Sequence, residues 1–302
     1  MPDRDAAEGT PWRALLADAV DRLAAAGLPS AEVDARRIVE RATSTDGAAY
    51  LRELDEPATE RGVGFFLEML ERRLAGEPLQ YVVGRWGFRT LELYVDPRVL
   101  IPRPETETVV EHALAELRGS PAFLATTAPV PVVDLGTGSG AIALSVAVEE
   151  PRTEVWAVER SAGAAAVARA NLAGLGRAAV RVRIVEGSWF EPLPDELRGR
   201  VAAVVSNPPY VAPSDPLPPE VAEWEPRDAL VPGPTGFEAV AHIIDGALQW
   251  LAPDGVVVVE LAPDQAERAV ARARAAGYAR AEWRADLTGR PRMLVARATP
   301  VP

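Results

Sequence analysis

The feature that most constrains the fold is a change of pattern near residue 131. From there, short apolar runs alternate with segments of helical composition. Five runs are expected to be strands, namely "PVVDL", "EVWAVE", "VRVRIVE", "VAAVVS" and "GVVVVEL". Two further segments, "ARAEWRA" and "RPRMLVARA", are expected to close the sheet as a hairpin. Short, all-apolar strands alternating with helices are typical of an α/β sheet covered on both faces, so we expect a seven-stranded sheet of this class.

The chain before this region has a different period. Residues 1–80 are predicted to form a smaller helical domain, with Thr10 as N-cap of its first helix. Residues 81–104 contain a half-buried strand pattern and two glycines, which predicts a β-hairpin linker. Pro104 is expected to open a helix, and 105–302 to form the sheet domain.

The first apolar run leads into a glycine-rich turn, "VVDLGTGSGAIAL". Gly136, Gly138 and Gly140 allow the backbone to approach a ligand closely, and the N–H groups of the following helix then face an anion. Glu159 ends the next strand, where a carboxylate can accept hydrogen bonds from both hydroxyls of a ribose. The turn also satisfies the dinucleotide fingerprint, with Ala141 at its last position. The turn alone therefore predicts a ribose-bearing cofactor without identifying it.

The stretch "NPPY" follows the fourth apolar run and narrows the choice of cofactor and reaction. Asn207 is expected at the carboxyl edge of the sheet, in the same crevice as the glycine turn. Its side-chain oxygen and the carbonyl of Pro208 can accept both hydrogens of a substrate NH2 group. Pro208 and Pro209 would hold these acceptors rigidly, and Tyr210 offers a ring to a planar group. This clamp suits transfer of a sulfonium methyl group to an amide or aryl amine, and nothing in it resembles a hydride-transfer site.

These motifs resemble the S-adenosylmethionine-dependent methyltransferases that modify planar nitrogens. More narrowly, the chain is similar to the release-factor glutamine methyltransferases (PrmC/HemK). The resemblance covers nearly the whole chain and rests on "GEPLQYVVG", "VLIPRPETE", "DLGTGSGAIAL", "SNPPYV", "EPRDALVPGPTGFE" and "WLAPDGVVVVEL". The segment "RPETE" at 103–107 separates it from the closely similar ribosomal-protein L3 glutamine methyltransferases.

The resemblance implies a Rossmann-like sheet and methyl transfer from S-adenosyl-L-methionine to the side-chain amide nitrogen (N5) of a glutamine. That glutamine would lie in the Gly-Gly-Gln loop of class 1 peptide chain release factors, with the helical domain giving a second contact. Catalysis is expected from Asn207 and Pro208, and the substrate pocket would be completed by Pro209 and Tyr210. The expected cofactor-binding residues are Gly136, Thr137, Gly138, Ser139, Gly140, Glu159, Trp189 and Asn207. Two positions depart from the family pattern, because Glu159 and Ser188 each stand where an Asp is usual.

Composition excludes several other classes of function. The formal net charge of −12 disfavours a nucleic-acid backbone as direct partner. The chain has no cysteine and two histidines, so we expect no disulfide and no metal site. The N-terminus is unlike a signal peptide, and no apolar run approaches the ~20 residues that span a bilayer. We expect a cytoplasmic monomer that does not interact with membranes.

Three alternatives stay open from the sequence. The same clamp suits a flipped base, so a nucleic-acid methyltransferase acting on adenine N6 or guanine N2 is one. The L3 glutamine methyltransferase is another, and a non-catalytic cofactor-binding protein is the third. The proline-rich segment 212–234 is expected to be either a solvent loop or a lid over the substrate.

Overall fold

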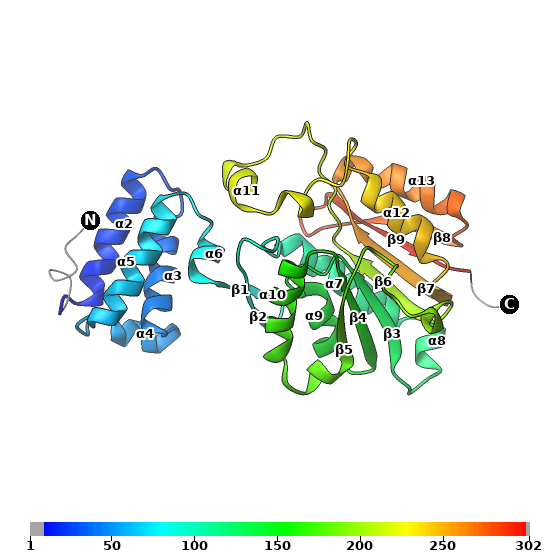
Figure 1. Ribbon diagram of the computed structural model, residues 1–302, viewed down its shortest axis with the longest axis horizontal. Helices are drawn as coiled ribbons and strands as arrows, with labels where there is room; N and C mark the ends of the chain where they lie inside the picture. The colour runs from blue at the N-terminus through cyan, green and yellow to red at the C-terminus, as the bar shows by residue number, and fades with distance from the viewer. Residues whose placement is uncertain (1–8, 300–302) are drawn as a thin grey trace. The chain divides into compact units, whose positions relative to one another are not determined.

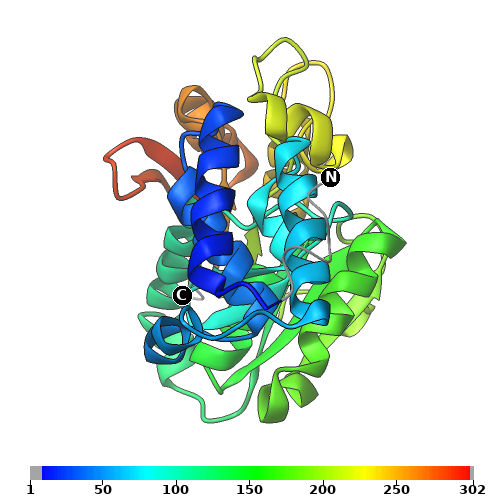
Figure 2. The same ribbon diagram turned by 90° about the vertical axis from the view of Figure 1, so that its left-hand side faces the viewer.

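The computed structural model describes residues 9–299, and the chain divides into two compact units, Met1–Arg85 and Trp86–Pro302 (Figure 1). In the first unit, α2, α3 and α5 form one bundle, shown in blue to cyan in Figure 2. The helices of this unit are α2 (Trp12–Ala25), α3 (Ala31–Thr43), α4 (Gly47–Glu53), α5 (Glu60–Leu74) and α6 (Leu79–Val83). Their apolar faces meet in a core that includes Leu23, Ile38, Phe66 and Leu70, all fully buried. Amphipathic spacing of these residues explains why this region is helical.

The start of α2 differs from the sequence-based expectation. The N-cap is Pro11, not Thr10, and it makes no side-chain capping bond. Pro11 keeps extended backbone angles because it forms an isolated β-bridge with Pro57. The helix therefore begins one residue later than predicted.

The second unit begins with a two-stranded sheet formed by β1 (Arg85–Phe88) and β2 (Leu91–Tyr94). These two strands lie inside the segment 81–104, where a β-hairpin linker was expected, and the short helix α6 precedes them. Phe88 and Leu93 join the core of the second unit, so the hairpin is packed as part of it. As predicted, Pro104 is the first residue of a helix, α7 (Pro104–Arg118).

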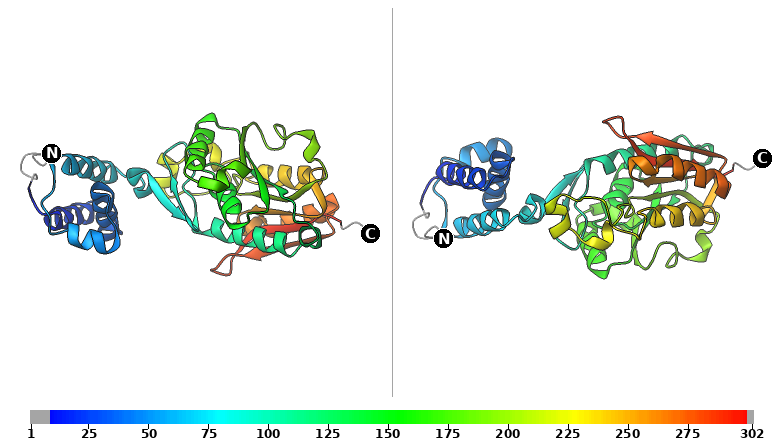
Figure 3. Two further views of the ribbon diagram at one scale, coloured as in Figure 1. Left: turned by 90° about the horizontal axis from the view of Figure 1, so that it is seen from below. Right: turned by 90° about the horizontal axis from the view of Figure 1, so that it is seen from above.

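The seven-stranded sheet confirms the predicted fold class. Its strands are β3 (Val130–Leu135), β4 (Thr153–Glu159), β5 (Val182–Glu186), β6 (Val201–Ser206), β7 (Leu251–Glu260), β8 (Arg280–Ala285) and β9 (Pro291–Arg297). Their order is β5-β4-β3-β6-β7-β9-β8, parallel except for β9, which is antiparallel to both neighbours. The closing hairpin β8–β9 is orange to red in Figure 3. The third predicted strand starts late because the 3-10 turn η1 (Gly176–Arg181) occupies its first residues.

Helices cover both faces of this sheet, as continuous apolar strands require. One core lies under α7 and α9 (Ala141–Glu149), and the other under α12 (Glu238–Ala247) and α13 (Ala266–Ala276). α10 (Ala162–Ala173) packs on β4 and β5. The remaining short elements are α8 (Pro121–Leu124), α11 (Pro219–Trp224), η2 (Asp195–Leu197), η3 (Arg227–Ala229) and η4 (Pro263–Gln265). Within residues 9–299, no helix is both long and apolar enough to cross a membrane.

The strand order places a switch point between β3 and β6. After β3 the chain continues outward through β4 and β5, and β6 then begins the other half of the sheet. The Ser206 hydroxyl donates a hydrogen bond of 2.6 Å to the Leu135 carbonyl and so ties the ends of the two strands together. Ligands of open α/β sheets bind at such a point, outside the carboxyl ends of the strands.

Candidate functional site

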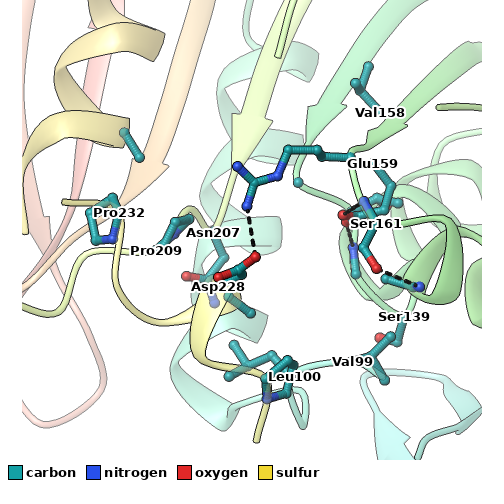
Figure 4. A pocket seen from close by; sticks show the side chains of 18 of the residues that line it. Val99, Leu100, Ser139, Val158, Glu159, Ser161, Asn207, Pro209, Asp228 and Pro232 are labelled. Carbon is teal, nitrogen blue, oxygen red and sulfur yellow. Dashed lines mark hydrogen bonds and ion pairs between the residues drawn. The ribbon is translucent and has the colours of Figure 1, made fainter. Parts of the chain in front are cut away.

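A cavity of about 960 Å³ lies at these carboxyl ends, and all of its lining residues belong to the second unit. This volume is in the range of small-molecule sites. The predicted site residues that line it are Gly136, Thr137, Gly138, Ser139, Glu159, Trp189, Asn207 and Pro209. Figure 4 shows Asn207 and Pro209 facing Glu159, Ser161 and Ser139 across the cavity. Gly140, Pro208 and Tyr210 are the predicted residues outside this lining.

The glycine turn forms a cradle whose left-handed backbone conformation favours glycine. Gly136 and Gly138 have φ angles of 72° and 56°, in the left-handed region. A Cβ added to either one would meet no protein atom within 4 Å, because that space belongs to the cavity. This part of the wall therefore fits the close approach of a cofactor to backbone. Gly140 has another role, because its added Cβ would lie 3.0 Å from Leu144 and disturb the packing of α9.

Glu159 is already oriented by the backbone. One carboxylate oxygen accepts a hydrogen bond of 2.9 Å from the Gly138 N–H, and the other accepts one of 2.9 Å from the Ser161 N–H. A carboxylate has about four lone-pair positions, so lone pairs remain for two hydroxyl donors. The longer Glu side chain thus reaches across to the glycine turn and can hold a ribose beside it.

Asp134, at the end of β3, braces the turn from behind. It is fully buried and accepts hydrogen bonds from the Thr137 hydroxyl at 2.5 Å and the Ala143 N–H at 3.1 Å. Burial is the main reason that its pKa rises to about 7, and the two hydrogen bonds oppose this rise. Asp134 therefore shapes the turn without lining the cavity.

Asn171 was not foreseen from the sequence. Its side-chain NH2 donates to the Ser139 carbonyl at 2.8 Å and to the Tyr94 carbonyl at 3.0 Å, and its oxygen accepts from the Tyr94 N–H at 2.7 Å. It therefore fastens the glycine turn to β2. No local pattern on α10 could reveal this, because the partners come from two distant segments.

Trp189 lies in the cavity wall beside two residues that the sequence left uncertain. Ser188 and His242 both line the cavity. The Trp189 and His242 rings are 5.8 Å apart, centroid to centroid. His242 lies on α12, and its place in the cavity wall does not follow from the helical periodicity of that segment.

Asn207 belongs to a hydrogen-bonded network that also was not foreseen. Its side-chain NH2 donates to the Thr106 hydroxyl at 3.0 Å, and that hydroxyl donates to Glu260 at 2.7 Å. The Tyr210 hydroxyl donates to the second oxygen of Glu260 at 3.0 Å. Tyr210 is thus tied to Glu260, and burial raises the pKa of its hydroxyl. Two sequence features could have pointed to this network, namely the carboxylate that follows the apolar run in "VVVVEL" and the Thr inside "RPETE".

The proline-rich segment 212–234 is not simply a solvent loop. Glu225, whose side chain is 1% exposed, pairs with Arg103 and accepts a hydrogen bond of 3.3 Å from the Ile101 N–H. The residues after it, including Asp228 and Pro232, line the cavity (Figure 4). In the described part of the chain, no group of His, Asp and Glu is arranged to hold a metal ion.

Comparison with known proteins agrees with this geometry. Residues 14–84 match the PrmC N-terminal domain family, and residues 118–218 match the methyltransferase small domain family. The structure of the hMettl16 catalytic domain is similar with a TM-score of 0.51 and 15% identity, over 80% of this chain and 82% of that one, which shows the fold alone.

Two curated relatives are similar over most of their length. The release factor glutamine methyltransferase of Burkholderia pseudomallei is 41% identical over 266 residues, covering 86% of this chain and 89% of that protein. The release factor glutamine methyltransferase of Moorella thermoacetica is 38% identical over 288 residues, covering 94% and 97%. The chain therefore belongs to the release factor glutamine methyltransferase family.

Proposed function

We propose that this protein transfers a methyl group from S-adenosyl-L-methionine to the N5 amide nitrogen of the glutamine in the Gly-Gly-Gln loop of class 1 peptide chain release factors. The observation that carries the proposal is the position of Asn207 in the wall of the cavity that the glycine turn also lines. Methylation of an amide nitrogen requires a hydrogen-bond acceptor for the substrate NH2 beside the cofactor site, and the side-chain oxygen of Asn207 can be that acceptor. Membership of the family supports the same substrate.

The cofactor would be held by the turn from Gly136 to Ser139 and by Glu159, with Trp189 offering an aromatic face to the adenine. When bound, it supplies an electrophilic methyl group. Asn207, in the cavity wall, would hold the substrate NH2 through its side-chain oxygen, and the family resemblance assigns the second oxygen acceptor to the backbone carbonyl of Pro208, which follows it but does not itself line the cavity. These acceptors would align the nitrogen and stabilise the positive charge that grows on it. Pro208 and Pro209 restrict the backbone, so little reorganisation is needed at the moment of reaction.

The proton balance needs no strong base at the nitrogen. Formation of the new N–C bond would break the bond between the sulfonium sulfur and its methyl carbon, whose electron pair stays on the sulfur of the departing S-adenosylhomocysteine. The substrate nitrogen would then carry a positive charge and release one proton to water. The neutral methylated amide remains. The chain's own contribution is therefore alignment and electrostatic stabilisation, which positioned groups supply efficiently.

The direct test uses S-adenosylmethionine with a labelled methyl group and purified release factor. Wild-type factor is compared with a factor whose loop glutamine is replaced by alanine, and the methyl group is located by mass spectrometry. We expect label on that glutamine only. Asn207→Ala should lower kcat about 10²–10³-fold, the range for loss of one preorganised polar group, while cofactor affinity is measured separately to show an intact fold. Absence of label on release factor would overturn the proposed substrate.

We also infer that the helical domain, assigned here to residues 1–80, contacts the release factor, and that the protein acts as a cytoplasmic monomer without binding nucleic acid. The match of 14–84 to the PrmC N-terminal domain supports the contact with the release factor, and the net charge of −12 supports the absence of nucleic-acid binding. Exposed apolar side chains on this unit are candidates for the contact, among them Leu51 and Phe65.

The contact can be tested by comparing whole release factor with a short Gly-Gly-Gln peptide. Substituting Ser for Leu51 and Phe65 should raise KM for the whole factor and leave peptide methylation unchanged. Leu287, which is 91% exposed on the other unit, gives a matched control as Leu287→Ser. Equal effects on factor and peptide would exclude a remote contact.

A further inference from the structure

We infer that Thr106 and Glu260 are positioning residues that fix which face of the Asn207 amide points into the cavity. The inference rests on the proposed function, because it concerns how the substrate NH2 is recognised. Neither residue need touch the reacting atoms. They would act through Asn207, by deciding whether it presents an acceptor or a donor.

The donors and acceptors of the network determine the orientation of the Asn207 amide. An ionised carboxylate only accepts hydrogen bonds, so Thr106 and Tyr210 must both donate their hydroxyl hydrogens to Glu260. The Thr106 oxygen then has only lone pairs left for its next neighbour. Asn207 lies 3.0 Å from it and must therefore offer its NH2. The amide oxygen of Asn207 is left for the substrate.

The opposite orientation would disable the clamp. If Asn207 turned its amide over, its NH2 would face the NH2 of the substrate, and two donors would meet. Thr106 would then have to donate to Asn207, and Glu260 would lose one of its two side-chain donors. A buried carboxylate short of hydrogen bonds is costly, so the native orientation is preferred.

The surroundings of Glu260 determine the pH range in which its carboxyl group is ionised and holds Asn207 in this orientation. Glu260 is 1% exposed, and burial is the main reason that its pKa rises to about 7. Arg292 on β9 and the hydroxyls of Thr106 and Tyr210 lower this pKa, and Glu105 on α7 raises it. Below this pKa the carboxyl group becomes a donor, so the Thr106 hydroxyl is free to donate to Asn207 and the amide can turn over. Activity is therefore expected to have an acid limb that belongs to Glu260.

The kinetic test separates orientation from simple stability. Thr106→Val removes the hydroxyl at nearly constant volume and should lower kcat about tenfold, the value of one hydrogen bond. Thr106→Ser restores the hydroxyl and should recover most of the loss. Thr108, which is buried on the same helix, gives the control Thr108→Val, which should leave kcat unchanged. Glu260→Gln should lower kcat and abolish the acid limb of the pH profile.

A second readout needs no substrate. Asn171 and Asn207 are the only asparagines of the chain, so ¹⁵N-asparagine labelling gives two side-chain NH2 groups in the NMR spectrum. Asn207→Asp would identify the Asn207 pair. Thr106→Val should shift this pair and speed its hydrogen exchange, while the Asn171 pair, held by Ser139 and Tyr94, stays unchanged.

The two readouts distinguish failure of this inference from failure of the proposed function. If release factor is not methylated by the wild type, the proposed function fails, and the NMR comparison alone decides the orientation. If Thr106→Val leaves the Asn207 resonances and kcat unchanged, the inference is overturned even though the enzyme is active. An acid limb that persists in Glu260→Gln would equally overturn the part assigned to Glu260.

Discussion

At the residue scale, two glycines of the turn border the cavity and the third packs against a helix. Gly136 and Gly138 would have nothing beside an added Cβ, whereas at Gly140 an added Cβ would meet Leu144. The sequence motif treats them alike, because spacing cannot tell a residue that faces a ligand from one that faces a helix. Their positive φ angles are shared, so the difference lies only in what surrounds them.

Gly138→Ala tests this distinction. We expect a loss of about 1–2 kcal/mol in the free energy of unfolding from the left-handed backbone. We also expect cofactor affinity to fall at least about tenfold, since a lost contact of about 1.4 kcal/mol has this effect. Calorimetric titration with S-adenosylmethionine measures the second quantity.

Gly289→Ala is the matched control, because Gly289 also has a positive φ, 81°, and open space around it. It should show the backbone strain without any change in affinity. Unchanged affinity in Gly138→Ala would mean that the cofactor does not approach this part of the turn.

The residues of the candidate site were partly predictable at this scale, since most of the expected ones line the cavity. Asn207 and the glycine turn carry short motifs whose geometry follows from strand, turn and helix. Thr106, Asn171 and Glu260 carry no such motif. Their contacts arise because distant segments meet, and neither the helices that carry Thr106 and Asn171 nor the strand that carries Glu260 has a local pattern that identifies the partner.

At the scale of elements, the sheet was predictable because its strands are short, apolar and separated by helices. The sequence also indicated the closing hairpin β8–β9. The observed boundaries differ from the predicted ones where tertiary pairing competes with local preference. Pro11 is an example, because it pairs with Pro57 and α2 therefore begins one residue later. The sequence does not show whether the segment 212–234 is a solvent loop or a lid, because its attachment depends on the pairing of Glu225 with Arg103, which are far apart in sequence.

Glu225→Gln should loosen that segment. The substitution weakens the pairing with Arg103 and leaves the Ile101 N–H contact in place, so we expect a local loss of about 1–3 kcal/mol. Hydrogen exchange of residues 212–234 should become faster, while β3 and β6 keep their protection. Exchange that speeds equally throughout the sheet would point to global destabilisation instead.

The paired replacement of Arg103 by Met and Glu225 by Leu serves as the comparison. Removing both charges leaves no unpaired charge, and the Ile101 N–H loses its acceptor in both variants, so the double replacement is expected to cost less than the single change Glu225→Leu. A double replacement more damaging than that single one would show that the pair does more than neutralise a buried carboxylate.

At the scale of the whole molecule, two buried carboxyl groups link stability to pH. Asp134 and Glu260 both have pKa values raised to about 7 by burial. The folded protein thus binds protons that the unfolded chain releases between about pH 4.5 and 7. Their combined effect makes the free energy of unfolding rise as pH falls from 8 towards 5, and this stability is lost as pH rises through 7.

Urea unfolding of the wild type and of Glu260→Gln between pH 8 and pH 5.5 measures this effect. Each group contributes at most about 1.4 kcal/mol per pH unit, so Glu260→Gln should have a visibly flatter dependence. Asp96 and Asp286, whose pKa values are lowered to about 2, lose their contributions only at more acidic pH and do not enter this window. Identical slopes in the two proteins would place the Glu260 pKa outside it.

If Asn207 and Pro208 clamp the substrate amide as proposed, they also limit the product. Both groups offer oxygen acceptors, and an unmodified glutamine amide has two hydrogens to satisfy them. A glutamine that already carries a methyl group has only one N–H left, so it leaves one acceptor unpaired and places its methyl group against an oxygen. The reaction should therefore end after a single turnover on each glutamine, and intact-mass analysis of exhaustively treated release factor should show the addition of one methyl group and no second.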